Sequence, residues 1–271
     1  MKLSSSLMNK LKWGDAIKVN GLPRHTNYPC VPGDVITVDL EEPKAEYAPE
    51  AGDLTILYED DWLLAVDKPA GMLIHPSRAR ISGTLANLVM GYYEKTGQNS
   101  LFHPLTRLDR DTFGVVLLAK NAYTHTLLQQ TDVEKIYHAL TLGAPEETAG
   151  TIDLPIGRKP LPSLLREVNP EGKPSLTEFR VLERQGEFAK LSLKAVTGRT
   201  HQLRVHCAAC GFPILGDPQY GSPACGEISG KLGLTSQLLC ARSLSFCHPV
   251  EEHPVKIVSA MDVDLKYLNI F

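Results

Sequence analysis

Long apolar runs are missing from this sequence. A membrane-spanning helix needs about 20 consecutive apolar residues, and the strongest run here covers only residues 114–119 (GVVLLA). A secretory signal needs an unbroken apolar region near the N-terminus, but Lys10 and Lys12 interrupt the opening segment. The sequence therefore predicts neither a membrane helix nor a secretory signal.

Cysteine is also sparse. The 271 residues include 6 cysteines, and their spacing matches no secreted disulfide framework. A chain of this length can bury a sizeable hydrophobic core, so it needs neither disulfides nor a structural metal for stability. We therefore expect a protein of a reduced, cytoplasmic compartment.

The chain has no excess of positive charge. Its 28 Lys and Arg stand against 31 Asp and Glu, which gives a net charge of −3 and an isoelectric point near 6.3. This excludes a generally basic, histone-like binder of nucleic acid. The charge is uneven, however, because residues 41–61 hold eight acids against Lys44, while residues 155–210 hold ten basic and five acidic side chains. That local excess leaves nucleic acid open as a partner.

Several common catalytic signatures are absent. There is no glycine-rich dinucleotide or phosphate loop, no His-Glu-x-x-His motif and no Gly-x-Ser-x-Gly elbow. Cys207 and Cys210 have the spacing of a zinc-binding pair, but they lie in an apolar run with helical spacing, where cysteine packs as a small hydrophobic residue. We therefore predict no metal and no cofactor, and a zinc-dependent enzyme is the alternative.

The order of predicted elements indicates an α+β fold. Apolar or alternating patterns predict strands, and apolar positions three and four residues apart predict helices. Because strands and helices do not alternate regularly, we expect a mixed, largely antiparallel central sheet flanked by helices and loops. The predicted strands are 54–58, 62–66, 115–119, 135–142, 177–182 and 188–196, and the predicted helices are 84–93, 121–130 and 200–209.

Residues 1–40 form a small unit of their own in this interpretation. A helix over 3–13 precedes two short strands around the turn pair Asn20-Gly21. Residues 41–53 are acidic and lack periodicity, which indicates a linker to a main domain over 54–271. Residues 3–38 resemble the later part of an S4-like RNA-binding module, so we interpret 1–40 as a truncated S4-like element. A purely structural β-element is the alternative.

Polar clusters interrupt otherwise apolar surroundings at 106–114 (TRLDRDTFG), 135–137 (KIY) and 197–206 (TGRTHQLRVH). Each alone has an ordinary explanation as a local salt bridge, a core tyrosine or a solvated helix face. In their order, and together with three further segments, they resemble the RluA-type family of RNA pseudouridine synthases. The further segments are 67–76 (DKPAGMLIHP), 211–221 (GFPILGDPQYG) and 239–249 (LCARSLSFCHP).

The resemblance runs from about residue 54 to residue 249 and implies the pseudouridine synthase fold. It also implies an isomerase that converts uridine in structured RNA without a cofactor. The reaction breaks the N1–C1′ glycosidic bond, turns the base and rejoins it through C5, and the target nucleotide must be flipped out of its helix. The S4-like segment favours ribosomal RNA as the substrate, with transfer RNA as the alternative.

The resemblance assigns Asp109 as the catalytic carboxylate, either as a nucleophile or as the base that starts the reaction. An arginine paired with it would keep it ionised and fix its geometry. The motif assigns that partner to Arg204. Arg199 is the competing candidate, for which we favour contact with phosphate or a structural role.

Three further residues have implied substrate contacts. Tyr137 would stack under the uracil with its hydroxyl near C5, whose proton must leave. Leu203 would form an apolar wall against the base. Arg107 resembles the arginine of the family that takes the vacated place of the flipped base and holds RNA phosphate.

Two positions depart from the pattern of the family, which commonly has His where this chain has Thr106 and Ser where it has Phe113. Both lie beside Asp109, so we expect an effect on the accepted RNA context or the rate. We interpret 67–71 as a structural turn, with Lys68 as a solvated surface charge. A monomer is expected, and a non-catalytic RNA-binding protein or a small-molecule enzyme on the same fold remain alternatives.

Overall fold

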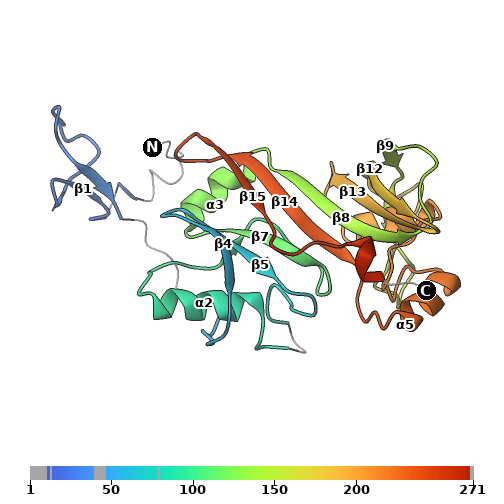
Figure 1. Cartoon of the computed structure of the whole chain (residues 1–271). Coiled ribbons are helices and arrows are strands. Elements are labelled where there is room, and N and C mark those ends of the chain that lie inside the picture. Colours follow the sequence, from blue (N-terminus) through green and yellow to red (C-terminus); the bar gives the residue numbers. More distant parts are fainter. Residues whose placement is uncertain (1–10, 13, 40–46, 78–79, 269–271) are drawn as a thin grey trace.

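The computed structural model describes residues 11–12, 14–39, 47–77 and 80–268. It contains a large sheet of ten strands, a three-stranded sheet and a two-stranded sheet. Figure 1 shows the large sheet running through the main body with helices packed against it, while the three-stranded sheet stands apart at the N-terminal end. The α+β fold predicted from the sequence is confirmed.

The large sheet is mixed. Its strand order is β4-β5-β7-β14-β8-β13-β12-β9, with β15 paired to β14 and β6 paired to β7. Strand β14 runs parallel to β7, and the other pairings in this sheet are antiparallel, as expected. The strands are β4 (Thr55–Glu59), β5 (Leu63–Lys68), β6 (His103–Pro104), β7 (Phe113–Ala119), β8 (Glu134–Leu142), β9 (Ala149–Asp153), β12 (Leu176–Gln185), β13 (Phe188–Ala195), β14 (Leu239–Cys247) and β15 (Pro254–Val258).

Strands β5 and β7 are buried on both faces. Leu64 and Val116 belong to the cluster that packs against α2 (Leu85–Lys95). Their neighbours Leu63 and Leu117 point to the opposite face and pack with α3 (Ala122–Gln129) and the β14–β15 pair. This alternation follows from the period of two in a strand. The two strands hold the loop between β6 and β7 in place.

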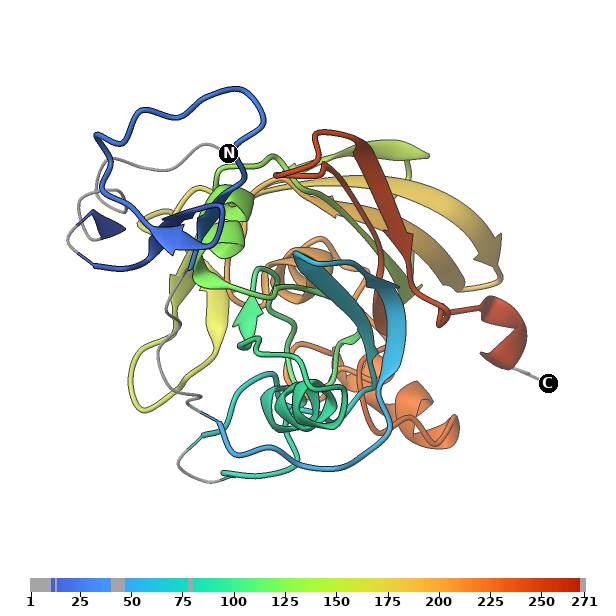
Figure 2. The same ribbon diagram turned by 90° about the vertical axis from the view of Figure 1, so that its left-hand side faces the viewer.

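The other half of the sheet supports α4 (Gln202–Ala209). Leu203 and Cys207 from α4 pack against Leu191 and Leu193 of β13. Helix α5 (Pro223–Lys231) and the short 3-10 helix η1 (Leu265–Leu268) contribute to a further cluster with β8 and β14. Because α4 packs against β13 and β13 pairs with β8, the start of α4 has a fixed position relative to β8. Figure 2 views the molecule from the side of the three-stranded sheet, with α2, β4 and β5 in front.

The two small sheets lie outside this core. Strands β10 (Ile156–Arg158) and β11 (Arg166–Val168) form a separate hairpin. Strands β1 (Ile17–Val19), β2 (Leu22–Pro23) and β3 (Ile36–Val38) form the other sheet. Between β1 and β2, Asn20 and Gly21 have φ of 52° and 80°, the left-handed conformations of a type I′ turn. The predicted first strand and turn are present, but the strand that follows the turn is β2. The segment 29–38, from which we expected the second strand, contributes β3 on the other edge of β1. Most of the predicted helix over 3–13 and residues 41–46 of the predicted linker lie outside the described residues.

Helices predicted over 84–93, 121–130 and 200–209 correspond to α2, α3 and α4, with ends that agree within two residues. All six predicted strands of the main domain are also present. Strands β6, β9, β10, β11, β14 and β15 and helices α5 and η1 of the main domain were not predicted. Among the described residues, no helix has both the length and the apolar character needed to cross a membrane.

Candidate active site

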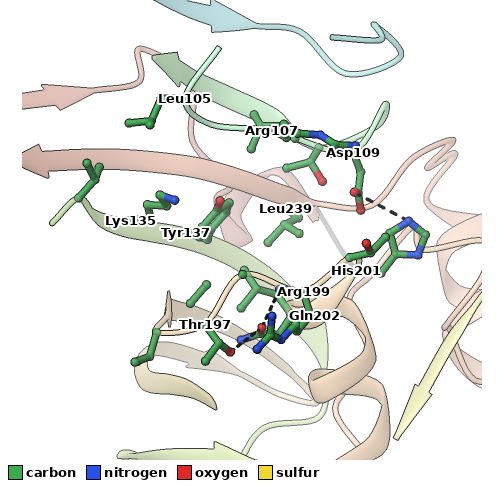
Figure 3. Close-up of a pocket in the computed structure, with 18 of the residues that line it drawn as sticks. Leu105, Arg107, Asp109, Lys135, Tyr137, Thr197, Arg199, His201, Gln202 and Leu239 are labelled. Carbon is green, nitrogen blue, oxygen red and sulfur yellow. Dashed lines mark hydrogen bonds and ion pairs between the residues drawn. The ribbon is translucent and has the colours of Figure 1, made fainter. Parts of the chain in front are cut away.

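A cavity of about 610 Å³ opens where three segments meet. The segments are the loop that leads into β7, the start of β8, and the turn from β13 into α4. All six residues that the resemblance singled out line it. Figure 3 shows Arg107 and Asp109 on one side, Arg199 on the opposite side, and Tyr137 between them. The fold thus gathers residues that are up to 97 positions apart in the sequence, from Arg107 to Arg204.

Asp109 is held by the guanidinium of Arg204. The Nη1 of Arg204 donates to Oδ2 of Asp109 at 3.0 Å. The same guanidinium donates from Nε and Nη2 to the two carboxylate oxygens of Asp217 at 2.8 and 2.7 Å. The side chains of Arg204 and Asp217 are 5% and 1% exposed, whereas Asp109 is 29% exposed. Only one end of this chain of charges therefore faces the cavity.

Burial opposes the positive charge of Arg204, but its hydrogen bonds and charge interactions with Asp217 and Asp109 outweigh burial and raise its pKa. The bidentate pair with Asp217 fixes the plane of the guanidinium. That leaves Nη1 directed at Asp109 in a set geometry. The partner of Asp109 in the structure is thus Arg204 and not Arg199, whose Nε donates instead to the carbonyl of Pro174 at 3.1 Å.

His201 is a further residue of the site. Its Nε2 lies 3.8 Å from Oδ1 of Asp109, and its Nδ1 lies 2.8 Å from the hydroxyl of Tyr220. That hydroxyl accepts the backbone N–H of Arg166 at 2.9 Å, and the Tyr220 ring lies under the guanidinium of Arg204 at 4.9 Å. Burial lowers the pKa of His201, against the opposing charge of Asp109. His201 therefore faces the second carboxylate oxygen as a neutral ring.

His201 directly precedes α4 in the left-handed backbone conformation, with φ of 58°, and two residues separate it from Arg204. Its contact with Asp109 is accompanied by one with Tyr220, which lies 19 positions further along the chain. No local pattern in the sequence marks these contacts.

Tyr137 and Leu203 form the apolar part of the cavity. Tyr137 lies on β8, opposite Leu193 of β13 and Ala241 of β14 in the strand register. Burial, with a contribution from the charge of Asp109, raises its pKa to about 12. The phenol is therefore protonated at neutral pH. Leu203 is buried and lines the same cavity.

Similarity to known proteins establishes the family of this chain. A sequence model described as RNA pseudouridylate synthase matches residues 62–209. The chain belongs to this family. A relative from Bacillus subtilis, named an uncharacterized RNA pseudouridine synthase, is 37% identical over 93% of this chain and 84% of the relative.

Two further proteins are similar over most of their length. The ribosomal large subunit pseudouridine synthase D of Xanthomonas campestris is 34% identical over 97% of this chain and 83% of its own. The solved structure of human RNA pseudouridylate synthase domain containing 1 has a TM-score of 0.62 and 26% identity, over 81% of this chain and 95% of its own. The chain is therefore an RNA pseudouridine synthase, an isomerase that acts on RNA.

The cavity of this synthase carries unpaired cations at its rim. Arg107 is exposed, and neither Arg107 nor Arg199 forms an ion pair with a described residue. Lys135 points into the cavity from β8, two residues before Tyr137 (Figure 3). Burial lowers its pKa, and it too has no ion pair among the described residues. These three side chains are available to an anionic substrate.

The expectation that Lys68 is a solvated surface charge is wrong. Its side chain is fully buried, and Nζ donates to the carbonyls of Pro69, Met72 and Arg110, each at 2.9 Å. Burial lowers its pKa to about 8, against the charges of Asp111 and Asp109. Lys68 thus anchors the loop that carries Asp109 to the end of β5, and 67–71 is a structural turn as interpreted.

The residue type at Thr106 has a structural reason. Thr106 is buried, and its Oγ1 accepts the N–H of Leu117 at 3.0 Å. Gly114 has φ of 110°, and a Cβ there would lie 2.4 Å from the carbonyl oxygen of Ala241. The loop around Asp109 is therefore fixed at one end by the Thr106 hydroxyl and at the other by the close approach of backbone that Gly114 allows.

The zinc alternative finds no support in the arrangement of side chains. Cys207 is buried in the core and burial raises its pKa, whereas Cys210 is exposed. His206 is occupied by Thr177 and by the carbonyl of Leu154. Within the described residues, no group of three or more His, Cys, Asp or Glu is placed to hold a metal ion.

Proposed function

We propose that this cavity isomerises a flipped-out uridine with Asp109 as the reacting carboxylate. The observation that carries the proposal is the pairing of Asp109 with Arg204 beside the ring of Tyr137 in one cavity. The guanidinium of Arg204 fixes the orientation of this carboxylate. In that orientation it acts either as a nucleophile at the ribose or as the base that starts the reaction.

Tyr137 and Leu203 receive the base in this proposal. The Tyr137 ring stacks on the uracil, and Leu203 closes the apolar side. The raised pKa of Tyr137 makes its hydroxyl a hydrogen-bond donor at the start of the reaction. Because the negative charge of Asp109 contributes to that raised pKa, loss of this charge during the reaction would lower the pKa of Tyr137. Tyr137 would then lose and regain a proton near C5 more readily.

The cations at the rim bind the RNA backbone. Arg107 enters the place that the flipped base leaves, and Arg199 holds a phosphate beside the target. Both lie at the cavity and are free of carboxylate partners in the described residues, so they need not break an ion pair to bind phosphate. Base flipping is required because uridine within a helix does not reach Asp109.

We propose ribosomal RNA as the substrate. The support is the similarity to relatives named ribosomal large subunit pseudouridine synthase D, at 34% and 32% identity. Residues 1–40 would add RNA contacts as a truncated S4-like element, joined through the linker 41–53 to a catalytic domain over 54–271. The three-stranded sheet of residues 17–38 and the first strand of the large sheet at Thr55–Glu59 are consistent with that division.

We further propose that the enzyme is a cytoplasmic monomer. Its six cysteines are unpaired, which suits a reducing compartment. All six proposed site residues come from one chain, so a second copy is not needed to complete the cavity. Light scattering of the purified protein tests the oligomeric state directly.

Tritium release tests the function. Unmodified ribosomal and transfer RNA transcripts labelled at uracil C5 are incubated with wild type and with Asp109→Asn, which keeps the shape of the side chain. We expect release from ribosomal RNA with wild type only, and equal RNA affinity for both proteins. Release from transfer RNA alone would replace the proposed substrate. RNA binding without release from any transcript would favour a non-catalytic RNA-binding protein.

A further inference from the structure

A second cavity, of about 460 Å³, lies along the β10–β11 hairpin. It is separate from the active-site cavity but shares three lining residues with it, Gly198, Arg199 and Thr200. Nothing in the proposed reaction uses the rest of its lining. The two cavities therefore meet at the turn that precedes α4.

The second cavity is strongly basic. Arg158, Arg166, Lys173 and Arg199 line it, against the single carboxylate of Glu171. None of these five side chains forms an ion pair with a described residue. These unpaired cationic side chains repel one another unless an anion lies between them in the cavity.

Two of these cations oppose each other directly. Arg158 and Arg166 are partners in the register of the hairpin. Like charges at directly opposite positions on an antiparallel pair destabilise it. A polyanion that lies across the hairpin would turn this unfavourable pair into two favourable contacts.

The hairpin has a defined position relative to the active site. The N–H of Arg166 donates to the Tyr220 hydroxyl, which also contacts His201, and His201 faces Asp109. The backbone of the hairpin is therefore tied to the residues around Asp109. A ligand that spans both cavities would meet a preformed surface.

Gly198 lies at the junction between the two cavities. Its φ lies outside the left-handed region, and a Cβ added there would meet no heavy atom within 4 Å. Neither backbone conformation nor packing therefore requires glycine at this position. The absence of a side chain leaves room for a chain of atoms to pass from one cavity into the other.

We infer that the second cavity binds the phosphate backbone of the RNA strand that leads to the target uridine. The inference rests on the proposed function, since it takes the flipped uridine to occupy the first cavity. The strand passes over Gly198, with Arg199 holding the phosphate at the junction. Arg158, Arg166 and Lys173 then contact successive phosphates along the hairpin.

The test compares two double variants of the full chain. Arg158→Gln/Lys173→Gln removes two exposed cations of the second cavity. Arg180→Gln/Lys256→Gln removes two exposed cations from strands β12 and β15 that line neither cavity. Both variants lose the same net charge. Binding of an unmodified large-subunit ribosomal RNA transcript is measured from about 50 to 200 mM salt.

We expect the cavity variant to bind about tenfold more weakly than the control variant at about 100 mM salt. The slope of log affinity against log salt should become shallower by about 1.5, because RNA binding releases fewer counterions once two phosphate contacts are lost. Turnover at saturating RNA should remain that of wild type. Equal affinities and slopes for the two variants would overturn the inference, and so would weaker binding with an unchanged slope.

Tritium release by wild type keeps this test separate from that of the function. If wild type releases tritium and the cavity variant binds as the control does, the reaction stands and the inference fails. If wild type releases none but the slopes differ as expected, the proposed function fails and the second cavity remains an RNA backbone site.

Discussion

The arginines at the floor and at the rim of the active site differ in one property, which is whether they already have an anionic partner. At the floor of the active site, defined as Asp109, Arg204 and Asp217, a 5%-exposed guanidinium is shared by two carboxylates. At the rim, defined as Arg107 and Arg199, the guanidinium groups have no carboxylate partner among the described residues. Arg107 at the rim is exposed to solvent, whereas Arg204 and Asp217 of the floor are closed to it.

The difference separates positioning from binding. A buried charge needs a partner because leaving it unpaired costs several kcal/mol or more, so the floor is satisfied before RNA arrives. A cation that must bind phosphate does so at lower cost when it has no ion pair to break. Ion pairing in the free protein thus predicts which arginines orient Asp109 and which wait for substrate.

The largest expected effect comes from breaking the floor. Arg204→Met leaves Asp217, 1% exposed, as a buried charge without its partner. We expect the free energy of unfolding to fall by about 3–5 kcal/mol, and turnover to fall to background because Asp109 loses its orientation. Urea unfolding and tritium release measure the two effects.

A second substitution separates stability from catalysis. Adding Asp217→Asn to Arg204→Met removes the unpaired charge while an amide oxygen still accepts the N–H groups of Gln219 and Tyr220. Part of the stability should return without any activity. If activity returned as well, Arg204 would act through the fold and not through Asp109.

The next effect concerns the loop that carries Asp109. Lys68→Met removes the donor from three carbonyls, one of which belongs to Arg110. We expect a loss of stability of about 1–3 kcal/mol and of turnover up to about 100-fold, since a shifted carboxylate misses the reacting atoms. Affinity for RNA should not change, because Lys68 lies below the surface.

Lys95→Met is the matched control, since Lys95 is exposed at the end of α2. It should leave stability, turnover and affinity unchanged. Unchanged turnover in Lys68→Met would instead show that the loop needs no anchor at this point.

The ordered motifs predicted residues that the fold gathers in one cavity, whereas local patterns left several elements of the fold unpredicted. Asp109, Tyr137 and Arg204 line one cavity because each motif lies at an element end that the sheet brings to the same place. Periodicity alone missed β14, where Arg242 and two serines interrupt the apolar pattern of a strand between β7 and β8. Tertiary pairing, not local preference, makes that segment a strand.

Lys68 was misjudged for a related reason. A lysine is almost never fully buried without partners, and its partners here are backbone carbonyls, which no sequence pattern marks. His201 was missed because its role depends on Tyr220, 19 positions further along the chain. Both residues depend on contacts that only the folded chain reveals.

At the rim, Arg199→Met should have a smaller and different effect. We expect KM for RNA to rise about tenfold with kcat unchanged, because the substitution removes a phosphate contact and leaves Asp109 in place. The slope of log affinity against log salt should become shallower by about 1, which corresponds to one lost phosphate contact. If Arg199→Met abolished turnover while Arg204→Met kept it, the roles of the two arginines would be reversed.

The smallest effect lies at His201, between floor and rim, and depends on pH. Burial holds its pKa below the 6.5 of the unfolded chain, although Asp109 and Asp217 oppose this and Arg204 and Arg166 assist it. As pH falls below 6.5, the unfolded chain therefore takes up a proton that the folded chain resists, and stability decreases.

His201→Asn removes that titration and suits the left-handed backbone, φ 58°, at this position. Relative to this variant, the free energy of unfolding of wild type should decrease as pH falls from 6.5 to the lower folded-state pKa of His201. Above pH 6.5 the difference between the two proteins should stay constant. Urea unfolding of both proteins at neutral and acidic pH measures the difference. A difference that stayed constant with pH would mean that His201 is not held neutral beside Asp109, and its contribution to the site would then be only steric.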